Sequence, residues 1–267
     1  MSATIELLHF EYSHFNEKAR WALDFKRVPH TRTSFLPGPH APTIKRLTGE
    51  TTVPVVRFGD EIVAGSARII DELERRVPEP PLYPRDTADR TRALDIQRHF
   101  DDEVGPLVRR GLFAALLQTP GYLCWMFSRE RNIIARAAYR TSFPVARVMM
   151  KRSMGISDQA SIEEAYRGIE DALDFVAREA GTSDGQLVGD TFTVADLAAA
   201  SLLGAAVMPP GSPIELPGPR PAEHTAWLER WARHPGAEWV RAQFRKHRPA
   251  SAEGAAPPAP SLLQRSA

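Results

Sequence analysis

Cysteine is almost absent from the sequence, which contains only Cys124. A single cysteine cannot form an intramolecular disulfide, and it excludes CxxC redox motifs and cysteine-based zinc motifs. Free thiols are typical of reducing compartments, so we expect a cytoplasmic protein.

Long apolar runs and an excess of charge are missing as well. The longest apolar run, Tyr122–Phe127, is far shorter than the roughly 20 residues that span a bilayer. The first residues enter a predicted strand without the charged-then-apolar pattern of a signal peptide, so we expect none. The formal net charge of +1 gives no reason to predict nucleic acid as a partner.

Residues 1–77 alternate between short apolar runs, which are typical of strands, and helical patterns. The predicted strands are Ile5–Phe10, Thr31–Phe35, Val53–Phe58 and Glu61–Ala64, with Gly59-Asp60 as a hairpin turn. The predicted helices are Asn16–Lys26, Pro42–Leu47 and a segment that begins at Gly65-Ser66, with Ser66 as N-cap. The order βαβ followed by αββα predicts a small mixed sheet with helices packed on it.

The rest of the chain lacks strand signals. Residues 78–86 are predicted to be a linker because four prolines occur between Pro78 and Pro84. Residues 87–248 are predicted to be all helical, and residues 249–267, rich in Ala, Pro and Ser, to be disordered. The predicted helices lie near Thr87–Gln118, Arg129–Arg152, Ser161–Glu179, Val194–Val207, Ala222–Arg233 and Gly236–Lys246.

Two helix starts carry local signals. Thr193 and Asp196 have the spacing of a capping box, which predicts a folding element at the start of the fourth of these helices. Ser13 and Asn16 lie where the first strand turns into the first helix. Unpaired N–H groups and the helix dipole favour an anion at such a turn, whether phosphate, carboxylate or thiolate.

Four short stretches together resemble the cytosolic glutathione S-transferase superfamily. They are Tyr12–Leu23, similar to its Ser-Pro-Phe-x-x-Lys-Val-Arg pattern, Thr52–Val55, similar to its Val-Pro, Gly65–Ile70, similar to its Glu-Ser-x-Ala-Ile, and Gly189–Asp196. Their order and spacing extend the resemblance over residues 4–247. The resemblance implies an α/β thioredoxin-like N-terminal domain followed by an all-α C-terminal domain.

The same resemblance implies a cytoplasmic homodimer that conjugates glutathione, or a related thiol, to an electrophilic small molecule in detoxification. Two alternatives stay open: a glutathione-dependent isomerase on the same site, and a non-enzymatic binding or scaffold protein that kept the fold. Glutathione would be a co-substrate, and no metal is implied.

By resemblance, Ser13 is the catalytic residue, whose hydroxyl faces the glutathione sulfur and stabilises the thiolate. A cis Pro54 would expose the Val53 backbone to the peptide-like ligand, and Ser66 would bind its γ-glutamyl carboxylate. The full glutathione-binding set is Ser13, Phe15, Thr52, Val53, Pro54, Gly65 and Ser66. Gly65 replaces the acidic residue of the family, and Thr51-Thr52 replaces a basic one, which weakens the predicted site.

Other interpretations compete at the same turn. Ser13 could act only as an N-cap, and the neighbouring Tyr12 could donate to the sulfur instead. Asn16 is expected to start the helix, and Glu17 with Arg20 to form a solvated or salt-bridged pair. The electrophile pocket is predicted to include Tyr12, His99 and Asp102.

A metal at His9 and His14 is not favoured, because only Glu11 accompanies them.

Residues 120–156 form an unusually long connection in such a helical domain. They hold seven Arg or Lys residues against one acid, Glu130, and several aromatic residues. This composition is compatible with peripheral contact to an acidic membrane surface or to a partner. The favoured interpretation is a solvated helical hairpin packed by its aromatic residues.

Overall fold

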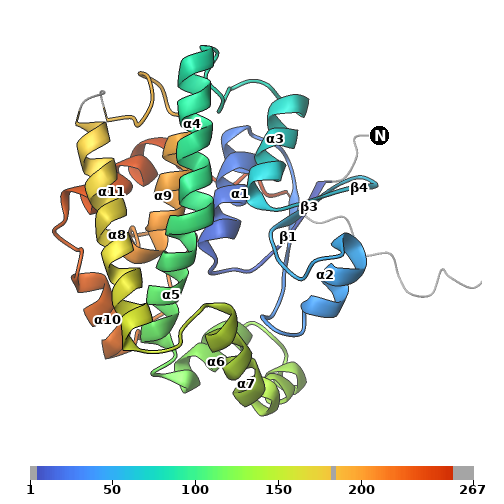
Figure 1. Cartoon of the computed structure of the whole chain (residues 1–267). Helices are drawn as coiled ribbons and strands as arrows, with labels where there is room; N and C mark the ends of the chain where they lie inside the picture. The colour runs from blue at the N-terminus through green and yellow to red at the C-terminus, as the bar shows by residue number, and fades with distance from the viewer. Residues whose placement is uncertain (1–4, 182–184, 255–267) are drawn as a thin grey trace, which may run out of the picture.

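The computed structural model describes residues 5–181 and 185–254. Its N-terminal part is a four-stranded sheet in the order β2-β1-β3-β4, in which β1 and β2 are parallel and the other neighbours are antiparallel. The strands are β1 (Ile5–His9), β2 (Thr31–Ser34), β3 (Val55–Phe58) and β4 (Glu61–Ala64). The helices of this part are α1 (His14–Phe25), α2 (Ala41–Thr48) and α3 (Ser66–Arg76). The thioredoxin-like order predicted from the sequence is confirmed (Figure 1).

The alternation of side chains along the strands separates the helices onto two faces. Leu7 and Val56 pack into the main core, together with side chains of α1 and α3. Leu8 and Val55, the neighbours of these two residues on their strands, instead form a small cluster with Ile44 of α2. The central strands β1 and β3 are therefore covered on both faces.

The remainder of the described chain is helical. It contains α4 (Thr87–His99), one π-helical turn η1 (Phe100–Val104), α5 (Gly105–Leu116), α6 (Pro120–Ser128), α7 (Ile133–Ser153), α8 (Gln159–Ala180), α9 (Val194–Val207), α10 (Ala222–Glu229) and α11 (Pro235–His247). Helix α9 lies at the centre, packed against α1, α4, α5 and α11. Its residues from Val194 to Ala206 are all buried, as expected of a helix that is apolar all round.

The predicted capping box at the start of α9 is confirmed. The carboxylate of Asp196 accepts from the Thr193 backbone N–H at 2.8 Å, and the Thr193 hydroxyl accepts from the Ala195 N–H at 3.2 Å. Asp196 also accepts from the Leu187 N–H at 2.8 Å, so it ties the preceding loop to the helix. Burial raises the pKa of this carboxyl to about 6.

Three boundary predictions are wrong in detail. The helix expected over Thr87–Gln118 is interrupted by η1, just before Pro106, whose ring nitrogen cannot donate to the preceding turn. The helix expected over Arg129–Arg152 is α7, and α6 precedes it; the apolar run of α6 carries no periodic signal. Ser66 is the first residue of α3 rather than its N-cap, which is Gly65.

The segment after α11 lies against the N-terminal part. The Ala252 N–H donates to the Asp24 carboxylate at 2.8 Å, the Gly254 N–H donates to the His30 carbonyl at 2.9 Å, and Glu253 pairs with Arg32 at 3.6 Å. Disorder was predicted for 249–267, whereas residues 249–254 lie in the described structure and these contacts fix Ala252–Gly254. The remaining residues of that prediction, 255–267, lie outside the described residues.

Within the described ranges, no helix combines the length and the apolar character needed to cross a membrane.

A glycine at the start of α11 allows a close approach between α8 and α11. A Cβ at Gly236 would lie 2.1 Å from the Leu173 carbonyl oxygen of α8, which is backbone and cannot rotate away. We expect Gly236→Ala to lower the free energy of unfolding by about 2–4 kcal/mol, measured by urea denaturation.

The matched control is Gly121→Ala in α6, where nothing lies within 4 Å of the added Cβ. We expect it to leave stability unchanged or to raise it by up to about 1 kcal/mol. Equal effects of the two substitutions would contradict the packing seen between α8 and α11.

Candidate functional site at one edge of the sheet

The strand register brings three of the predicted stretches to the same edge of the sheet. Leu8 of β1 is opposite Val55 of β3, and Val55 is opposite Ala64 of β4. The chain leaving β1 toward Ser13, the chain entering β3 through Pro54 and the chain leaving β4 into Gly65 therefore lie side by side.

Ser13 caps α1 at this edge. Its backbone is extended, with φ −103° and ψ 126°, and its Oγ accepts from the Asn16 N–H at 3.4 Å. This bond uses the oxygen as acceptor and leaves the hydroxyl proton free to donate elsewhere. The side chain is half-buried. Capping and donation to a ligand are therefore compatible at Ser13.

The first turn of α1 is anchored to the helical part through His14. His14 is buried, and its Nε2 lies 3.0 Å from the Gly105 carbonyl oxygen. Burial lowers the pKa of His14 to about 3, so the ring is neutral and donates from Nε2. The Phe15 ring packs on Gly105 so closely that a Cβ there would lie 2.5 Å from Phe15 Cζ. Both contacts hold the Ser13 turn in place.

Asn16 follows in the same turn and is fully buried. Its amide Nδ2 and Oδ1 have no hydrogen-bond partner among the described residues. The sequence predicts a helix-start residue at this position, and the structure does place it there, in the first turn of α1.

Pro54 and Gly65 are joined directly. The Val53-Pro54 peptide bond is cis, as the resemblance predicts, and the Pro54 carbonyl accepts from the Gly65 N–H at 2.9 Å. Gly65 has φ 92° and ψ 134°, a conformation that L side chains rarely adopt, so glycine suits this position better than an acidic residue. Thr52, exposed, donates from its hydroxyl to Glu50 at 3.3 Å.

Arg68 is a residue that the sequence analysis did not single out. A Cβ at Gly65 would lie 3.8 Å from the Arg68 Nε, so this guanidinium is next to the start of α3, where Ser66 is buried. Arg68 also forms an ion pair with Glu50 at 3.6 Å. A basic side chain in the first turn opposes the helix dipole, and this unfavourable placement is the sequence signal that could have marked it.

Tyr12 lies on the side of the turn that faces the α6–α7 segment. Arg129 and Glu130, which follow α6, both influence the titration of its hydroxyl, and burial raises its pKa. Tyr122 of α6 donates from its hydroxyl to the Pro217 carbonyl at 2.7 Å. Because burial raises its pKa, the Tyr12 hydroxyl stays protonated at neutral pH and can donate a hydrogen bond.

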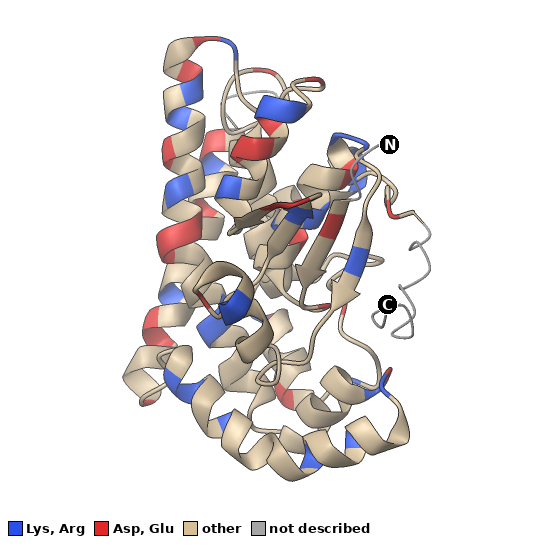
Figure 2. Ribbon diagram, turned by 90° about the vertical axis from the view of Figure 1, so that its right-hand side faces the viewer, with Lys and Arg blue, Asp and Glu red and all other residues tan. Residues whose placement is uncertain are grey.

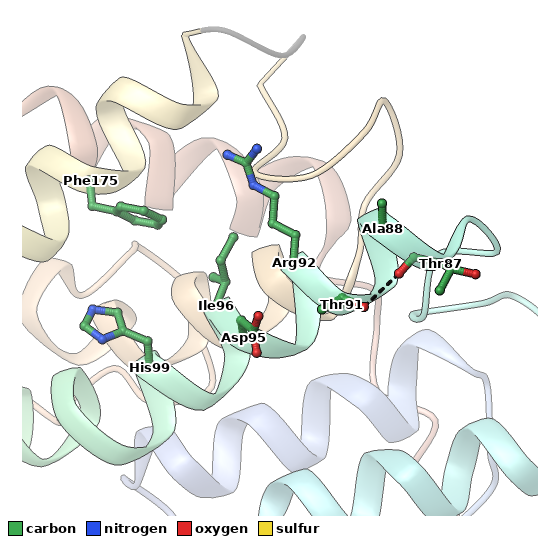
Figure 3. A pocket seen from close by; sticks show the side chains of 8 residues that line it. All are labelled: Thr87, Ala88, Thr91, Arg92, Asp95, Ile96, His99 and Phe175. Atoms are coloured by element: carbon green, nitrogen blue, oxygen red, sulfur yellow. Dashed lines mark hydrogen bonds between the residues drawn. The ribbon is translucent and has the colours of Figure 1, made fainter.

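His99 and Asp102 are placed elsewhere. His99 lines a cavity of about 720 Å³ whose walls come from α4 and from Phe175 of α8, without Ser13 or Tyr12 (Figure 3). His99 also pairs with Glu103 at 3.4 Å, and Asp102 is exposed on η1. The structure does not bring these two residues to the edge that carries Ser13.

Glu17 and Arg20 form a salt bridge, one of the two alternatives predicted, but it is buried rather than solvated. Arg20 Nε lies 2.8 Å from Glu17 Oε2, and neither side chain is more than 2% exposed. The other Glu17 oxygen binds Arg248 Nε at 2.6 Å. This pair connects α1 to the end of α11, which sequence spacing alone could not reveal.

The two histidines near the turn each have a structural partner. Arg20 donates to His9 Nδ1 at 2.9 Å, and burial lowers the pKa of His9 to about 3. His14 donates to the Gly105 carbonyl, as described above. No group of three or more His, Cys, Asp or Glu side chains suited to a metal ion occurs in residues 5–181 and 185–254.

The α6–α7 segment packs against the loop that follows β2. Arg131 donates to the Ser34 carbonyl, and the Tyr139 hydroxyl donates to the Pro37 carbonyl at 3.2 Å. Tyr139 and Phe143 are buried, with ring centroids 5.7 Å apart. The predicted aromatic packing of this segment is therefore present on its inner side.

Comparison with known proteins agrees with this geometry. Residues 7–81 match the model of the family described as "Glutathione S-transferase, N-terminal domain". No protein of curated function matches the chain in sequence.

Solved structures extend the likeness to the helical part. A glutathione S-transferase from Rhodospirillum rubrum has a TM-score of 0.60 and 19% identity, covering 91% of this chain and 88% of its own. A glutathione S-transferase from Methylobacterium radiotolerans, in complex with glutathione sulfonate, has a TM-score of 0.57 and 23% identity, and the match covers 92% of this chain and 95% of its own. A bacterial maleyl pyruvate isomerase of the zeta class has a TM-score of 0.58 and 19% identity, and the match covers 89% of this chain and 90% of its own. At these identities the likeness shows the fold alone.

The anchoring of the Ser13 turn by His14 gives a pH-dependent contribution to stability. A histidine whose folded pKa, about 3, lies below its unfolded value, about 6.5, stabilises fully above pH 6.5 and progressively less toward pH 3. We expect His14→Gln, which keeps a donor but cannot titrate, to remove up to about 1.4 kcal/mol per pH unit from the slope of stability in that window.

The measurement is urea unfolding of both proteins between pH 4 and pH 7. Parallel stability curves would contradict a buried neutral His14.

Proposed function

We propose that this chain, a member of the glutathione S-transferase superfamily, binds glutathione at the sheet edge described above and conjugates it through its sulfur to an electrophilic small molecule. The single observation that carries the proposal is the convergence of Ser13, the cis Val53-Pro54 bond and Ser66 at that edge. Each belongs to a different segment, and only the strand register brings the three together.

In this proposal Ser13 activates the sulfur. Its hydroxyl proton is not used in capping, and the positive end of the α1 dipole lies in the same turn. Both stabilise thiolate over thiol and lower the pKa of the bound thiol. The thiol proton leaves to solvent, and the sulfur forms a bond to the electrophilic carbon. Either a leaving group departs with the electron pair of its bond, or a double bond opens and its other carbon takes a proton from solvent. No covalent enzyme intermediate is required.

The start of α3 would hold the γ-glutamyl end. The hydroxyl and backbone N–H of Ser66 lie at a helix N-terminus, where a carboxylate is favoured. Arg68 adds a positive charge beside Gly65, where the family has an acidic residue. We propose that Arg68 shifts the balance of this end of the site toward carboxylate binding and away from amine binding. Val53 would pair its backbone with the peptide part of the ligand, with Thr52 and Phe15 beside it.

The electrophile would lie next to Tyr12. Its half-buried hydroxyl remains protonated and faces Arg129, so the two side chains can stabilise negative charge that develops on the electrophile. His99 and Asp102 are weaker assignments for this pocket, because His99 lines a cavity that Ser13 does not reach.

Two alternatives use the same fold. An isomerase would also bind glutathione but return it unchanged, and one fold neighbour is a maleyl pyruvate isomerase, a bacterial glutathione S-transferase of the zeta class. A non-enzymatic binding protein would not need the thiol site. Isothermal calorimetry with millimolar glutathione distinguishes the non-enzymatic protein from the two enzymes. Absence of binding heat would exclude both the transferase and the isomerase.

We also propose a cytoplasmic homodimer. Reduced glutathione is a substrate of the reaction, and the single cysteine, Cys124, is free. Light scattering coupled to size exclusion tests the oligomeric state, and a monomeric mass would reject it.

The role of Ser13 is tested by Ser13→Ala, with Ser13→Thr as the control that retains a hydroxyl. We expect Ser13→Ala to raise the pKa of bound glutathione by about 1–2 pH units, read from the ultraviolet absorbance of the thiolate, and Ser13→Thr to change it little. Conjugation of a generic aromatic electrophile at neutral pH should fall about tenfold or more in Ser13→Ala.

An unchanged thiolate titration in Ser13→Ala, with glutathione still bound, would show that Ser13 is only a cap. Tyr12→Phe is the next variant in that case, since Tyr12 is the alternative donor.

A further inference from the structure

Helix α7 exposes most of the large apolar side chains on the described surface. Among residues 5–181 and 185–254, six such side chains are exposed, and five of them lie on α7. Their exposed fractions are 81% for Ile133, 79% for Ile134, 66% for Val145, 64% for Met149 and 52% for Val148. The concentration of these residues on one helix is unlike the scattered apolar residues of an ordinary surface.

These side chains form one continuous face. At 3.6 residues per turn, the five positions fall on the same side of the helix, together with the exposed Ala137, Ala138, Thr141 and Pro144. The buried residues of α7, Tyr139, Phe143 and Met150, fall on the opposite side. Helix α7 is therefore apolar on two faces, one against the protein and one toward solvent. We call the second face the outer face of α7.

Positive charge borders the outer face along one side. Arg136, Arg140 and Arg147 lie between the outer and the buried faces, Lys151 and Arg152 lie on the outer face at its C-terminal end, and all five are exposed. Residues 131–157 contain no Asp or Glu. The surroundings of the outer face thus carry several positive charges without a local acid to neutralise them.

The helix lies where a large flat surface can reach it. The α6–α7 segment forms one end of the molecule, below the sheet and α5 (Figure 1). In the perpendicular view α7 runs along the base of the molecule, with Lys and Arg on the visible side (Figure 2). Its 21 residues correspond to about 30 Å of helix.

We propose that the outer face of α7 docks on the surface of a membrane that contains anionic phospholipid. The apolar side chains would enter the boundary between headgroups and acyl chains while the flanking arginines and Lys151 contact phosphate groups. This surface is separate from the edge of the sheet that carries Ser13, and the inference does not depend on the proposed chemistry.

The charge pattern argues against a second copy of this chain as the occupant. Two α7 helices packed through their outer faces would bring ten positive side chains together, five from each, without a single acid in either helix. An anionic lipid surface supplies negative charge over the whole length of the helix, and it also accepts apolar side chains, which a soluble acidic partner does only through a matching groove.

The test is co-sedimentation of the full chain with vesicles of phosphatidylcholine alone or with about one third phosphatidylglycerol, at low and high salt. We expect binding only to the anionic vesicles, weakened by salt. The double variant Ile134→Gln/Val145→Gln should reduce binding to the anionic vesicles at least about tenfold. The matched control is Ile62→Gln, an exposed apolar residue on β4.

A second experiment tests the role of the positive charges. It compares the double variant Arg136→Gln/Arg140→Gln with the double variant Arg167→Gln/Arg233→Gln, which changes two exposed arginines outside α7. We expect the first pair to lower binding roughly 10- to 30-fold and the second pair to change it little. Circular dichroism and thermal unfolding check that each variant folds like the wild type.

Three results would overturn the proposal. One is the absence of binding to anionic vesicles by the folded wild type. Another is equal weakening by the α7 variants and their controls. The third is a change in oligomeric state, rather than in vesicle binding, when the outer face is altered, which would make a second copy the occupant.

Discussion

The buried charges of helix α1 are the constraint on which the rest of this structure depends. Five acidic or basic side chains of α1 and its C-cap are buried besides His14: Glu17, Lys18, Arg20, Asp24 and Lys26. Their partners come from distant segments: Arg248 after α11, Asp101 of η1, Arg32 of β2 and Glu74 of α3. Removing one partner of a buried pair typically costs about 3–5 kcal/mol of folding free energy. Moving α1 away from these partners would separate several buried ion pairs, so the helix is held in one position. The charges of α1 thus act as specific links between the sheet and the helical part.

The position of the proposed thiol site follows from this network. Because α1 cannot shift along its axis without separating Lys18 from Asp101 and Glu17 from Arg248, its N-terminal turn is fixed relative to the sheet. His14 repeats the same connection one turn earlier, through the carbonyl of Gly105 at the end of η1. Asp101 comes from the π-helical turn, and this carbonyl comes from the first residue of α5, which directly follows it. A hydroxyl that must sit beside a bound sulfur benefits from such an arrangement, since preorganised groups lose little freedom when the ligand arrives.

The α6–α7 segment combines two roles that the two sides of one helix keep apart. Its inner side fills the space beside the loop after β2, with Tyr139 bonded to Pro37 and Phe143 buried. Its outer side carries an apolar face that no described part of the chain covers. A helix with a single apolar face would be explained by packing alone, whereas the second apolar face calls for a partner outside the molecule. The fold therefore joins a site at the sheet edge to a separate surface whose chemistry suits anionic lipid.

Features that depend on local chemistry could be predicted from the amino-acid sequence. The apolar runs and turns of residues 1–77 predicted a small mixed sheet with helices packed on it, Thr193 and Asp196 predicted the start of α9, and the motif around Ser13 predicted its place at the start of α1. Which charges pair could be seen only in the folded chain, because the partners of α1 lie as far away in sequence as Arg248. The same holds for the break at η1, the place of Arg68 beside Gly65 and the exposure of Ile134 and Val145. Periodicity identifies the apolar positions of a helix, but only its neighbours decide which of them are covered.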